Sequence, residues 1–555
     1  MMTNQEIAEY FELLSKLMDI HGADSFRAKS YGAAAFRIAK LPMPLSTMDL
    51  ESLKSIPAIG VSTAQKIIEI AQTGKLAALE EYLAKTPQGV VEMLSVKGIG
   101  PKKIGLLWKE LGIESIGELE YACQENRLTS LKGFGAKTQS AILEHIGFLK
   151  ANSGYCLYAE ADTLMQQIGQ SLHARYPNAL CSPVGDYRLQ RNVLDKLEWL
   201  CTLRKEDILN IFADTEHQAS ETPEGLSIQL PGMPPLKFSL VADKTAFYLS
   251  LFKQSGSASF IEAFEQQYSY PSEVESEADI FQHNKLTYIP PALREQATIL
   301  AQAAAQQVPE LLQVSDIKGI IHSHSSYSDG QHSLEQMATA ARDKGYEYLV
   351  ISDHSQAAFY ANGLSVERIY QQHAEIDALN QKLAPFKILK GIESDILSDG
   401  RLDYEDEVLQ SFDLVIASVH SNLKMTEEKA MQRLLAAIAH PATTILGHPT
   451  GRLLLSRNGY PVDHKTLIDA CAHYGVAIEI NAHPRRLDLD WTWIEYALSQ
   501  NVLLSVNPDA HSIEGMDLVR YGVYAAQKGG LSKDKNLSSW SLQALGAYLA
   551  GRKKV

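Results

Sequence analysis

The stretch Ile321-His322-Ser323-His324-Ser325-Ser326-Tyr327-Ser328-Asp329-Gly330 decides the fold of the C-terminal half of this chain. It begins in an apolar run that reads as a strand. Alternate residues of a strand point the same way, so His322 and His324 can reach one cation together. Asp329 supplies a carboxylate in the turn that follows. The stretch therefore predicts a metal site beside the first strand of a larger sheet.

From residue 317 onward, apolar strand-like runs alternate with helical patterns, and the helices include 333–344 and 464–474. Seven runs read as strands: 319–322, 348–354, 388–393, 414–420, 444–448, 477–481 and 503–511. Strand–helix alternation at this rhythm predicts a parallel sheet, and seven units predict a barrel.

Polar side chains of metal-ligand type follow these strand-like runs. They are His354, Glu393, His420, His448, Asp509 and His511. In a parallel α/β barrel the carboxyl ends of the strands converge on the active site. One histidine after a strand is more often a satisfied core or capping residue, but the complete set favours a metal cluster.

These residues resemble the PHP family of polymerase and histidinol phosphatase metallohydrolases over about 317–540. The resemblance implies a distorted (β/α)7 barrel that holds two to three divalent metal ions. Imidazole and carboxylate ligands without thiolate suit manganese or zinc, with iron as a further option. The implied ligands are His322, His324, Asp329, His354, Glu393, His420, His448, Asp509 and His511.

The family's arrangement also implies how the ligands share the ions. Glu393 would bridge two of them. One ion would take His322, His324 and Asp509, a second His420 and His448, and a third Asp329, His354 and His511. The expected catalytic residues are His322, His324, Glu393, Asp509 and His511.

Two further residues of this half are candidates for substrate contacts. Arg452 could hold a substrate phosphate or form an ion pair at the barrel rim. His483 stands where the family more often has asparagine, and it could support a ligand or touch substrate. For each residue, the sequence does not decide between the two alternatives.

The front of the chain repeats one phrase three times, at intervals of about 40 residues: Leu53–Gly60, Leu94–Gly100 and Leu131–Gly135. Each phrase predicts a tight glycine turn that opens a helix, which turns backbone N–H groups outward to hold an anion. One copy could be an ordinary helix–turn–helix. Three copies resemble the helix-hairpin-helix module, which grips DNA phosphates without reading sequence.

The expected DNA contacts are Gly60, Gly98, Gly100, Lys102, Lys103, Gly133, Gly135 and Lys137. In the first copy Ala58 stands where glycine is expected, so this hairpin is expected to bind most weakly.

Between these halves the chain resembles a family X DNA polymerase, and with the hairpins the resemblance covers residues 4 to about 297. It rests on Val184-Gly185-Asp186-Tyr187-Arg188 in a mixed α/β segment and on Thr287–Glu295 at a thumb-like end. Such polymerases hold two metal ions on an Asp-x-Asp pair and a third aspartate.

The departures from the polymerase pattern affect its metal ligands. The pair falls on Lys196 and Glu198, and the third aspartate falls on Ser239. A lysine cannot bind magnesium, and Asp186 would repel a triphosphate. The sequence therefore predicts a palm that binds DNA but no longer polymerises. The alternative, a working gap-filling polymerase, requires Glu198 with Asp186 or Asp195 to hold magnesium.

Six segments are expected: a helical DNA-binding domain (1–85), a fingers-like domain with two hairpins (86–150), the palm (151–242), a thumb (243–297), a connector helix (298–316) and the PHP domain (317–555). The fold class is thus multidomain, with helical, α+β and barrel parts.

Five scattered cysteines exclude a cysteine-built zinc site and suit a reducing compartment. No apolar run reaches the roughly 18 residues of a membrane span.

Net charge of −15 does not favour nucleic acid, but lysines such as Lys102 and Lys103 cluster in the front part. The resemblance to family X polymerases that carry a PHP domain implies, together with these features, a metal-dependent DNA 3′-5′ exonuclease or phosphodiesterase of DNA repair. Its expected partner is gapped or 3′-recessed duplex DNA, and a cytoplasmic, nucleoid-associated monomer is expected. A small-molecule phosphatase of the histidinol-phosphate type and a non-enzymatic DNA-binding scaffold are the alternatives, and the complete ligand set disfavours the scaffold.

Overall fold

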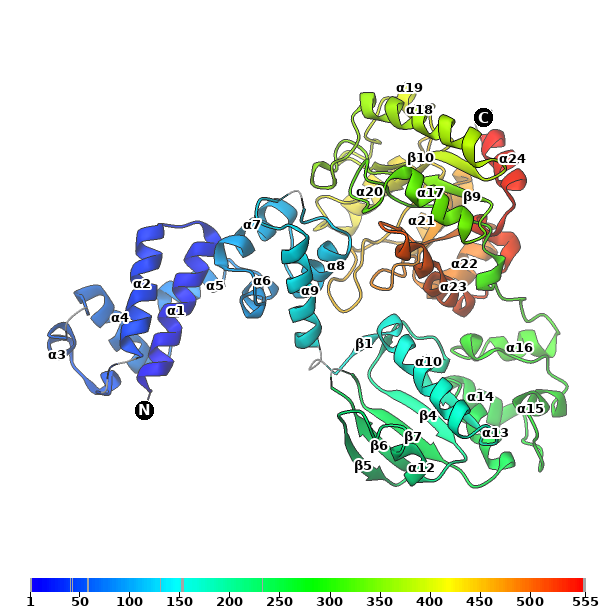
Figure 1. Cartoon of the computed structure of the whole chain (residues 1–555), viewed down its shortest axis with the longest axis horizontal. Coiled ribbons are helices and arrows are strands. Elements are labelled where there is room, and N and C mark those ends of the chain that lie inside the picture. The colour runs from blue at the N-terminus through cyan, green and yellow to red at the C-terminus, as the bar shows by residue number, and fades with distance from the viewer. Residues whose placement is uncertain are drawn as a thin grey trace. The chain divides into compact units, whose positions relative to one another are not determined.

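The computed structural model describes residues 2–39, 41, 43–56, 59–129, 131–150, 154–231 and 233–552 (Figure 1). They cluster into two compact units, Met1–Gln124 with Leu131–Ile146, and Glu125–Ser130 with Gly147–Val555. The six finer boundaries expected from the sequence stay predictions. Within the described ranges, no helix is long and apolar enough to cross a membrane.

The N-terminal unit is helical throughout its described part. Its helices are α1 (Asn4–His21), α2 (Ser25–Ile38), α3 (Leu50–Lys54), α4 (Val61–Thr73), α5 (Ala77–Leu83), α6 (Gln88–Glu92), α7 (Pro101–Leu111), α8 (Ile116–Gln124) and α9 (Ala136–Lys150). A capping box between Thr3 and Glu6 begins α1, and left-handed Gly22 ends it. Apolar residues at helical spacing, among them Phe11 and Leu14, form the buried face of α1.

The C-terminal unit begins with a mixed sheet. Its strands and helices are β1 (Cys156–Leu157), α10 (Tyr158–Arg175), β2 (Cys181–Val184), α11 (Gly185–Arg188), β3 (Val193–Leu194), β4 (Leu197–Cys201), α12 (Lys205–Leu209), β5 (Gln218–Thr222), β6 (Gly225–Gln229) and β7 (Leu236–Leu240). The five-stranded sheet has the order β2-β4-β7-β6-β5, and β1 pairs with β3. Trp199 and Phe238, on the parallel strands β4 and β7, pack in the core of this layer.

Four helices follow this sheet: α13 (Lys244–Lys253), α14 (Ala258–Gln267), α15 (Glu277–His283) and α16 (Ile299–Ala304). The connector helix expected over 298–316 is wrong in length, because α16 ends at Ala304 and Gln306 takes a positive φ of 58°. Pro309 lies five residues after Ala304, and its ring is incompatible with a continuing helix there.

The barrel has seven parallel strands in sequential order, as expected: β8 (Gly319–Ile320), β9 (Tyr348–Ile351), β10 (Lys387–Asp395), β11 (Leu414–Ser418), β12 (Ile445–Leu446), β13 (Ala477–Asn481) and β14 (Leu504–Asn507). Its helices are α17 (Leu334–Asp343), α18 (Val366–Leu383), α19 (Asp406–Leu409), α20 (Glu427–Ile438), α21 (His464–Tyr474), α22 (Ile494–Ser499), α23 (Val519–Lys528) and α24 (Leu542–Arg552). Most residues of these strands are buried and apolar, as is typical of parallel strands covered by helices.

The histidine stretch itself closes the barrel. His324 donates its backbone N–H to the Ala510 carbonyl at 2.8 Å, and Ala510 donates to the His322 carbonyl at 3.2 Å. The expectation that both histidines sit on the strand is wrong, because β8 ends at Ile320 and His322 has a φ of +67°. This bridge places His322 and His324 opposite Asp509 and His511.

Candidate metal centre

Glu393, near the carboxyl end of β10, is the hub of the cluster at the mouth of the barrel. Its Oε1 lies 3.0 Å from His448 Nε2, 3.1 Å from His420 Nε2 and 3.3 Å from His322 Nε2. Its Oε2 lies 3.0 Å from His354 Nδ1. Four imidazoles from four strand ends thus surround one carboxylate that is 1% exposed.

A second part of the cluster surrounds His324. Its Nε2 lies 3.1 Å from Asp509 Oδ1, and its ring stacks on His511 with centroids 4.1 Å apart. Asp329 lies 3.4 Å from His511 Nε2 and 3.5 Å from His354 Nε2. All nine residues expected as ligands therefore meet in one buried region.

Burial and charge act in opposite directions on these groups. Burial disfavours the ionised form of Glu393, but the imidazoles of His420 and His322 outweigh it and hold the pKa of this carboxyl well below its usual range. Burial likewise opposes a charge on His322, yet Asp509 and Glu479 raise its pKa well above 6.5. The cluster is a site of strong mutual attraction between carboxylates and imidazoles.

The donor set fits divalent metal ions. Among the described residues, several atoms of the expected ligands are buried without a hydrogen bond: His322 Nε2, His324 Nδ1, Asp329 Oδ2, His354 Nδ1 and Glu393 Oε2. Buried polar atoms are rarely left unpaired, and lone pairs that converge in this way are the arrangement that a cation satisfies.

Three sets of barrel ligand atoms lie within 4.8 Å of one another: His322, His324 and Asp509; His324, Asp329, His354 and His511; and His354, Glu393 and His420. The first set matches one expected ion site, and the second matches another with His324 added. In the third set His354 takes the place that was expected for His448. The assignment of ligands to individual ions stays a prediction.

Two carboxylates that the sequence reasoning did not single out orient the histidines. Glu479, in the middle of β13, accepts hydrogen bonds from His322 Nδ1 at 2.6 Å and from the His448 backbone N–H at 2.8 Å. Asp395, at the end of β10, lies 2.9 Å from His420 Nδ1. A carboxylate on the far ring nitrogen fixes the tautomer and orientation of a ligating imidazole. In the sequence, Glu479 is a charged residue inside the largely apolar strand-like run Ala477–Asn481, and this could have marked it as functional.

The two candidate substrate contacts lie in different surroundings. Arg452 is held by Asp490 Oδ2 at 2.5 Å and by the Arg486 carbonyl at 2.8 Å, which supports the ion-pair alternative. His483 is buried, and its backbone N–H bonds to the Asn481 side chain at 3.0 Å. Arg486, which the sequence reasoning missed, places its Nε 3.8 Å from Asp509 Oδ2. A substrate role for Arg452 or His483 stays a prediction.

The segment Glu125–Ser130, which clusters with the C-terminal unit, adds charged groups near this centre. Glu125 is ion-paired with His511 and lies 3.4 Å from His483 Nε2. With Asp509 and His511 it forms a fourth set of potential ligand atoms. Nothing in the sequence pattern around Glu125 indicated this placement.

In the helical unit the second and third glycine phrases form turns that open helices. Gly98 and Gly133 adopt φ of 93° and 92°, and Gly100 is the N-cap of α7. Beta carbons added at Gly98, Gly100 and Gly135 would meet nothing within 4 Å, so these glycines leave space outside the fold. Such open backbone at a helix N-terminus suits a phosphate group.

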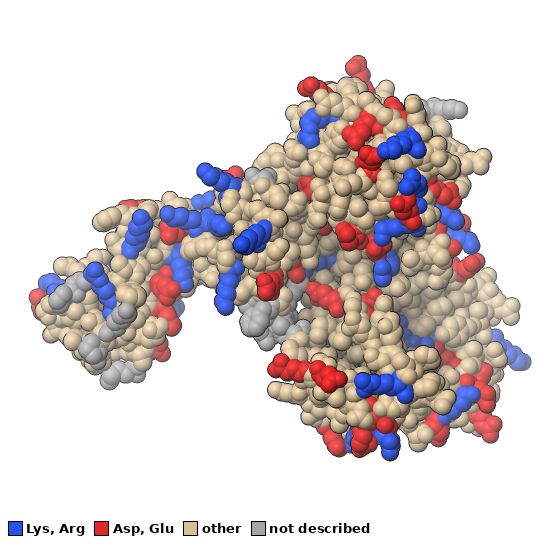
Figure 2. Space-filling view, viewed as in Figure 1, with Lys and Arg blue, Asp and Glu red and all other residues tan. Residues whose placement is uncertain are grey.

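The structure qualifies two expectations, one for Lys103 as a DNA contact and one for the first hairpin. Lys103 donates to the Gly133 carbonyl at 3.0 Å and so ties the second hairpin to the third. Gly60 is the N-cap of α4, whereas Ala58 lies outside the described residues. Lys102 and Lys137 are exposed. Lys and Arg side chains are prominent on the visible face of this unit (Figure 2).

The palm presents paired charges where a polymerase needs metal ligands. Lys196 Nζ lies 3.0 Å from Glu198 Oε1, and Arg191 lies 3.2 Å from Asp186 Oδ1. Gly185 is packed so closely on the Glu198 carboxylate that an added Cβ would lie 2.1 Å from Oε2. Over the described part of the chain, no group of potential ligand atoms includes a palm residue.

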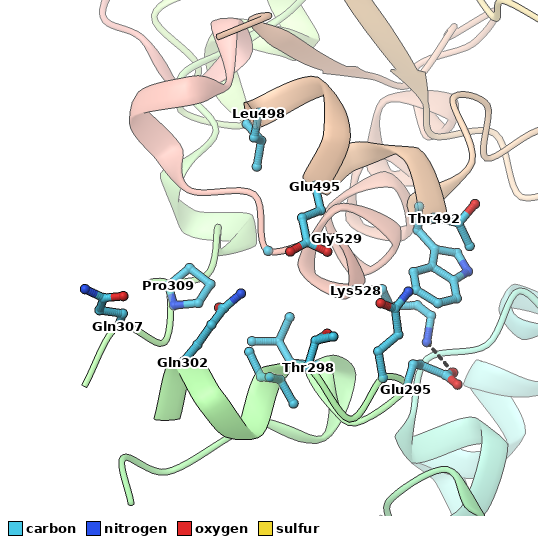
Figure 3. A pocket seen from close by; sticks show the side chains of 15 residues that line it. Glu295, Thr298, Gln302, Gln307, Pro309, Thr492, Glu495, Leu498, Lys528 and Gly529 are labelled. Carbon is cyan, nitrogen blue, oxygen red and sulfur yellow. Dashed lines mark hydrogen bonds and ion pairs between the residues drawn. The ribbon is translucent and has the colours of Figure 1, made fainter. Parts of the chain in front are cut away.

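A cavity of about 220 Å3 lies where α16 and the chain around it meet α22 and α23 (Figure 3). Lys528 is buried at its edge, 2.7 Å from Glu295 Oε1 and 4.6 Å from the Trp491 ring centroid. Its lining includes none of the nine expected ligands. The ion pair joins the thumb-like segment to the barrel.

Comparison with known proteins agrees with this division. A Helix-hairpin-helix domain matches residues 2–76, a SAM-like Helix-hairpin-helix tandem matches residues 90–147, and a PHP domain matches residues 321–483. The chain is 33% identical to the DNA polymerase/3'-5' exonuclease PolX of Bacillus subtilis strain 168, over 99% of each chain.

Shorter matches reach proteins named as phosphatases. A "Probable phosphatase" of Thermoanaerobacter sp. strain X514 is 25% identical over 42% of this chain and 94% of its own. Another, of Caldanaerobacter subterraneus subsp. tengcongensis, is 28% identical over 29% of this chain and 62% of its own.

Proposed function

The chain belongs to the family of the DNA polymerase/3'-5' exonuclease PolX, and we propose that its working active site is the barrel. There it would remove nucleotides from DNA 3′ ends during repair, as a monomer on gapped or 3′-recessed duplexes. The observation that carries the proposal is the contrast between two sites of one chain. The barrel brings nine expected ligand residues together, whereas the palm has Lys196 paired with Glu198.

When bound, divalent ions would supply Lewis-acid stabilisation of phosphate charge and an activated water nucleophile. The chain's own part is to hold the ligands. Glu479 and Asp395 fix the rings of His322 and His420 by hydrogen bonds to their far nitrogens. Glu393 attracts four imidazoles and keeps the two parts of the cluster together. Manganese or zinc suits this set, and iron would also fit.

The helical unit would supply DNA affinity without sequence preference. Its glycine turns expose backbone N–H groups, and Lys102 and Lys137 add positive charge beside them. Residues 1–146 are close to charge balance although the whole chain carries −15, which reduces repulsion of DNA by this unit.

Loss of polymerisation is the second half of the proposal. The ammonium of Lys196 neutralises the Glu198 carboxylate that a magnesium ion would need. Arg188, in the segment that resembles a polymerase palm, forms a bidentate pair with Glu277 at 2.8 and 3.0 Å. Glu198 could therefore bind a magnesium ion, and Arg188 a nucleotide, only if these ion pairs were broken.

One assay tests both halves. A duplex with a one-nucleotide gap and a 5′-labelled primer is incubated with the full chain, manganese and labelled deoxynucleotides. We expect the primer to shorten from its 3′ end and to gain no label. Clear incorporation would show a working polymerase and overturn the proposed loss, and an intact primer would overturn the proposed exonuclease.

A phosphatase is the second candidate, favoured by the matches to proteins named as probable phosphatases. It predicts rapid turnover of a small phosphomonoester together with an intact 3′-recessed primer. The same preparation, assayed on both substrates at one manganese concentration, separates the two candidates.

A further inference from the structure

The loop between β9 and α18 carries two aromatic residues beside the metal centre. Metal ligand His354 anchors it, since Leu364 donates its N–H to the His354 carbonyl at 2.9 Å. Ala358 donates to the Ser355 carbonyl at 3.0 Å, and a Cβ at Gly363 would lie 1.9 Å from the same carbonyl oxygen. The loop therefore has one tightly fixed path next to the cluster.

Phe359, in a 3-10 turn of this loop (Phe359–Ala361), is 72% exposed. Among the described residues only Phe26, in the other unit, is a more exposed large apolar side chain. The neighbouring residues Ala358 and Ala361 are buried and hold the turn in place. The phenyl ring covers little of the fold, so packing does not explain why it stands here.

Tyr360 connects this exposed ring to the metal centre. Its ring lies edge-on to Phe359, with centroids 5.8 Å apart, and 6.3 Å from the ring of His354. Its hydroxyl is buried and has no hydrogen-bond partner in the structure. A buried hydroxyl without an acceptor carries a desolvation penalty that a phosphate oxygen of a bound substrate would offset.

We propose that Phe359 and Tyr360 form the nucleotide-binding wall of this centre. Phe359 stacks on the 3′-terminal base of a single DNA strand, and Tyr360 donates its hydroxyl to a nonbridging oxygen of the phosphate that is cleaved. Every base has a flat face, so this contact suits an enzyme that removes nucleotides without sequence preference. The inference rests on the proposed exonuclease function, and it names the frayed or single-stranded 3′ end as the substrate form.

The test uses the full chain with manganese and three substrates. These are a 5′-labelled single-stranded oligonucleotide, the same oligonucleotide with an abasic 3′-terminal nucleotide, and bis(p-nitrophenyl) phosphate. Phe359→Ala is expected to raise KM for the normal oligonucleotide by about 5- to 100-fold, with kcat within about twofold. The abasic end should weaken wild-type binding similarly and leave the variant unaffected.

Matched variants give each residue its own readout. Tyr474→Ala removes another half-exposed aromatic ring, on the outer helix α21, and should keep wild-type KM on all three substrates. Phe359→Trp should restore oligonucleotide KM. Tyr360→Phe is expected to lower kcat/KM about tenfold on both the oligonucleotide and bis(p-nitrophenyl) phosphate, because both present a phosphodiester oxygen.

Wild-type KM in Phe359→Ala, or an equal effect of the abasic end on wild type and variant, would overturn the stacking role. Unchanged kcat/KM in Tyr360→Phe would overturn the phosphate contact. If the wild-type chain cleaves no DNA 3′ end, the proposed function fails and this inference fails with it. Normal wild-type cleavage therefore separates the two failures.

Discussion

Glu479 shows why a ligand set read from sequence is incomplete at the scale of residues. Its two carboxylate oxygens accept from four donors: His322 Nδ1, the His448 backbone N–H, Asn481 Nδ2 and Asn507 Nδ2. Six of the nine expected ligands were indicated by their place after strand-like runs, and the resemblance to the PHP family completed the set. Glu479 could not be predicted in this way, because its role depends on which residues the neighbouring strand ends place beside it.

The structure allows this positioning role to be tested. Glu479→Gln replaces an acceptor oxygen by an amide N–H that opposes the donors around it. We expect about 10- to 100-fold weaker metal binding, as for other partners of ligating histidines. Metal content after dialysis against graded chelator measures this without reference to activity. Glu375, on α18, accepts a hydrogen bond from the Tyr327 hydroxyl, and Glu375→Gln should leave metal retention unchanged.

Direct removal of ligands should have a larger effect. The double variant His322→Ala and His324→Ala deletes two imidazoles from the buried cluster, and we expect at least about a 100-fold loss of 3′ nuclease activity. Activity on a 5′-labelled oligonucleotide and bound metal should fall together. Full nuclease activity in a metal-replete double variant would refute the site.

At the scale of elements, the sequence predicted strands and helices better than their ends. All seven barrel strands and the spans of α17 and α21 follow from apolar periodicity. The extension of the first strand through His322 was wrong, because barrel closure by Ala510 imposes a positive φ there. Local patterns do not contain that long-range constraint.

The thumb-like segment is held together by a buried charge network. Glu277 bonds bidentately to Arg188 and lies 2.6 Å from Arg294 Nη1, whose side chain has no exposed surface. Glu277→Gln leaves two guanidinium groups without their anion, so we expect a loss of about 3 kcal/mol in the free energy of unfolding. Urea unfolding at pH 7 measures this. Glu275→Gln, at an exposed ion pair with Lys244, should change it by less than about 0.5 kcal/mol.

The same network predicts a pH dependence. Burial opposes ionisation of Glu277, but Arg294 and Arg188 outweigh it and lower its pKa to about 2. The unfolded value is about 4.3, so the stabilisation is complete above that pH and is lost as pH falls toward 2. The stability difference between wild type and Glu277→Gln should therefore shrink from pH 5 to pH 3. A constant difference over this range would contradict the assignment.

At the scale of the whole molecule, one chain joins a DNA-gripping unit to a phosphoesterase barrel. The linkage raises the effective concentration of DNA near the barrel without requiring any contact between the units. Hairpin charges should then affect the binding of DNA but not the chemistry at the metal centre. This separation predicts a specific pattern in the kinetics of the full chain.

Lys102→Ala with Lys137→Ala removes two exposed cations beside the glycine turns. Each lost phosphate contact should reduce the slope of log affinity against log salt by about 0.9, so we expect a change of about 1.8 and a higher KM for duplex DNA at 150 mM salt. Hydrolysis of bis(p-nitrophenyl) phosphate should be unchanged. Lys382→Ala with Lys533→Ala, an equal charge change on the barrel unit, should keep the wild-type slope. If the salt slope falls equally in both double variants, overall charge rather than the hairpins governs DNA binding. Only direct contacts between the hairpin lysines and DNA phosphates would make the two pairs of lysines differ.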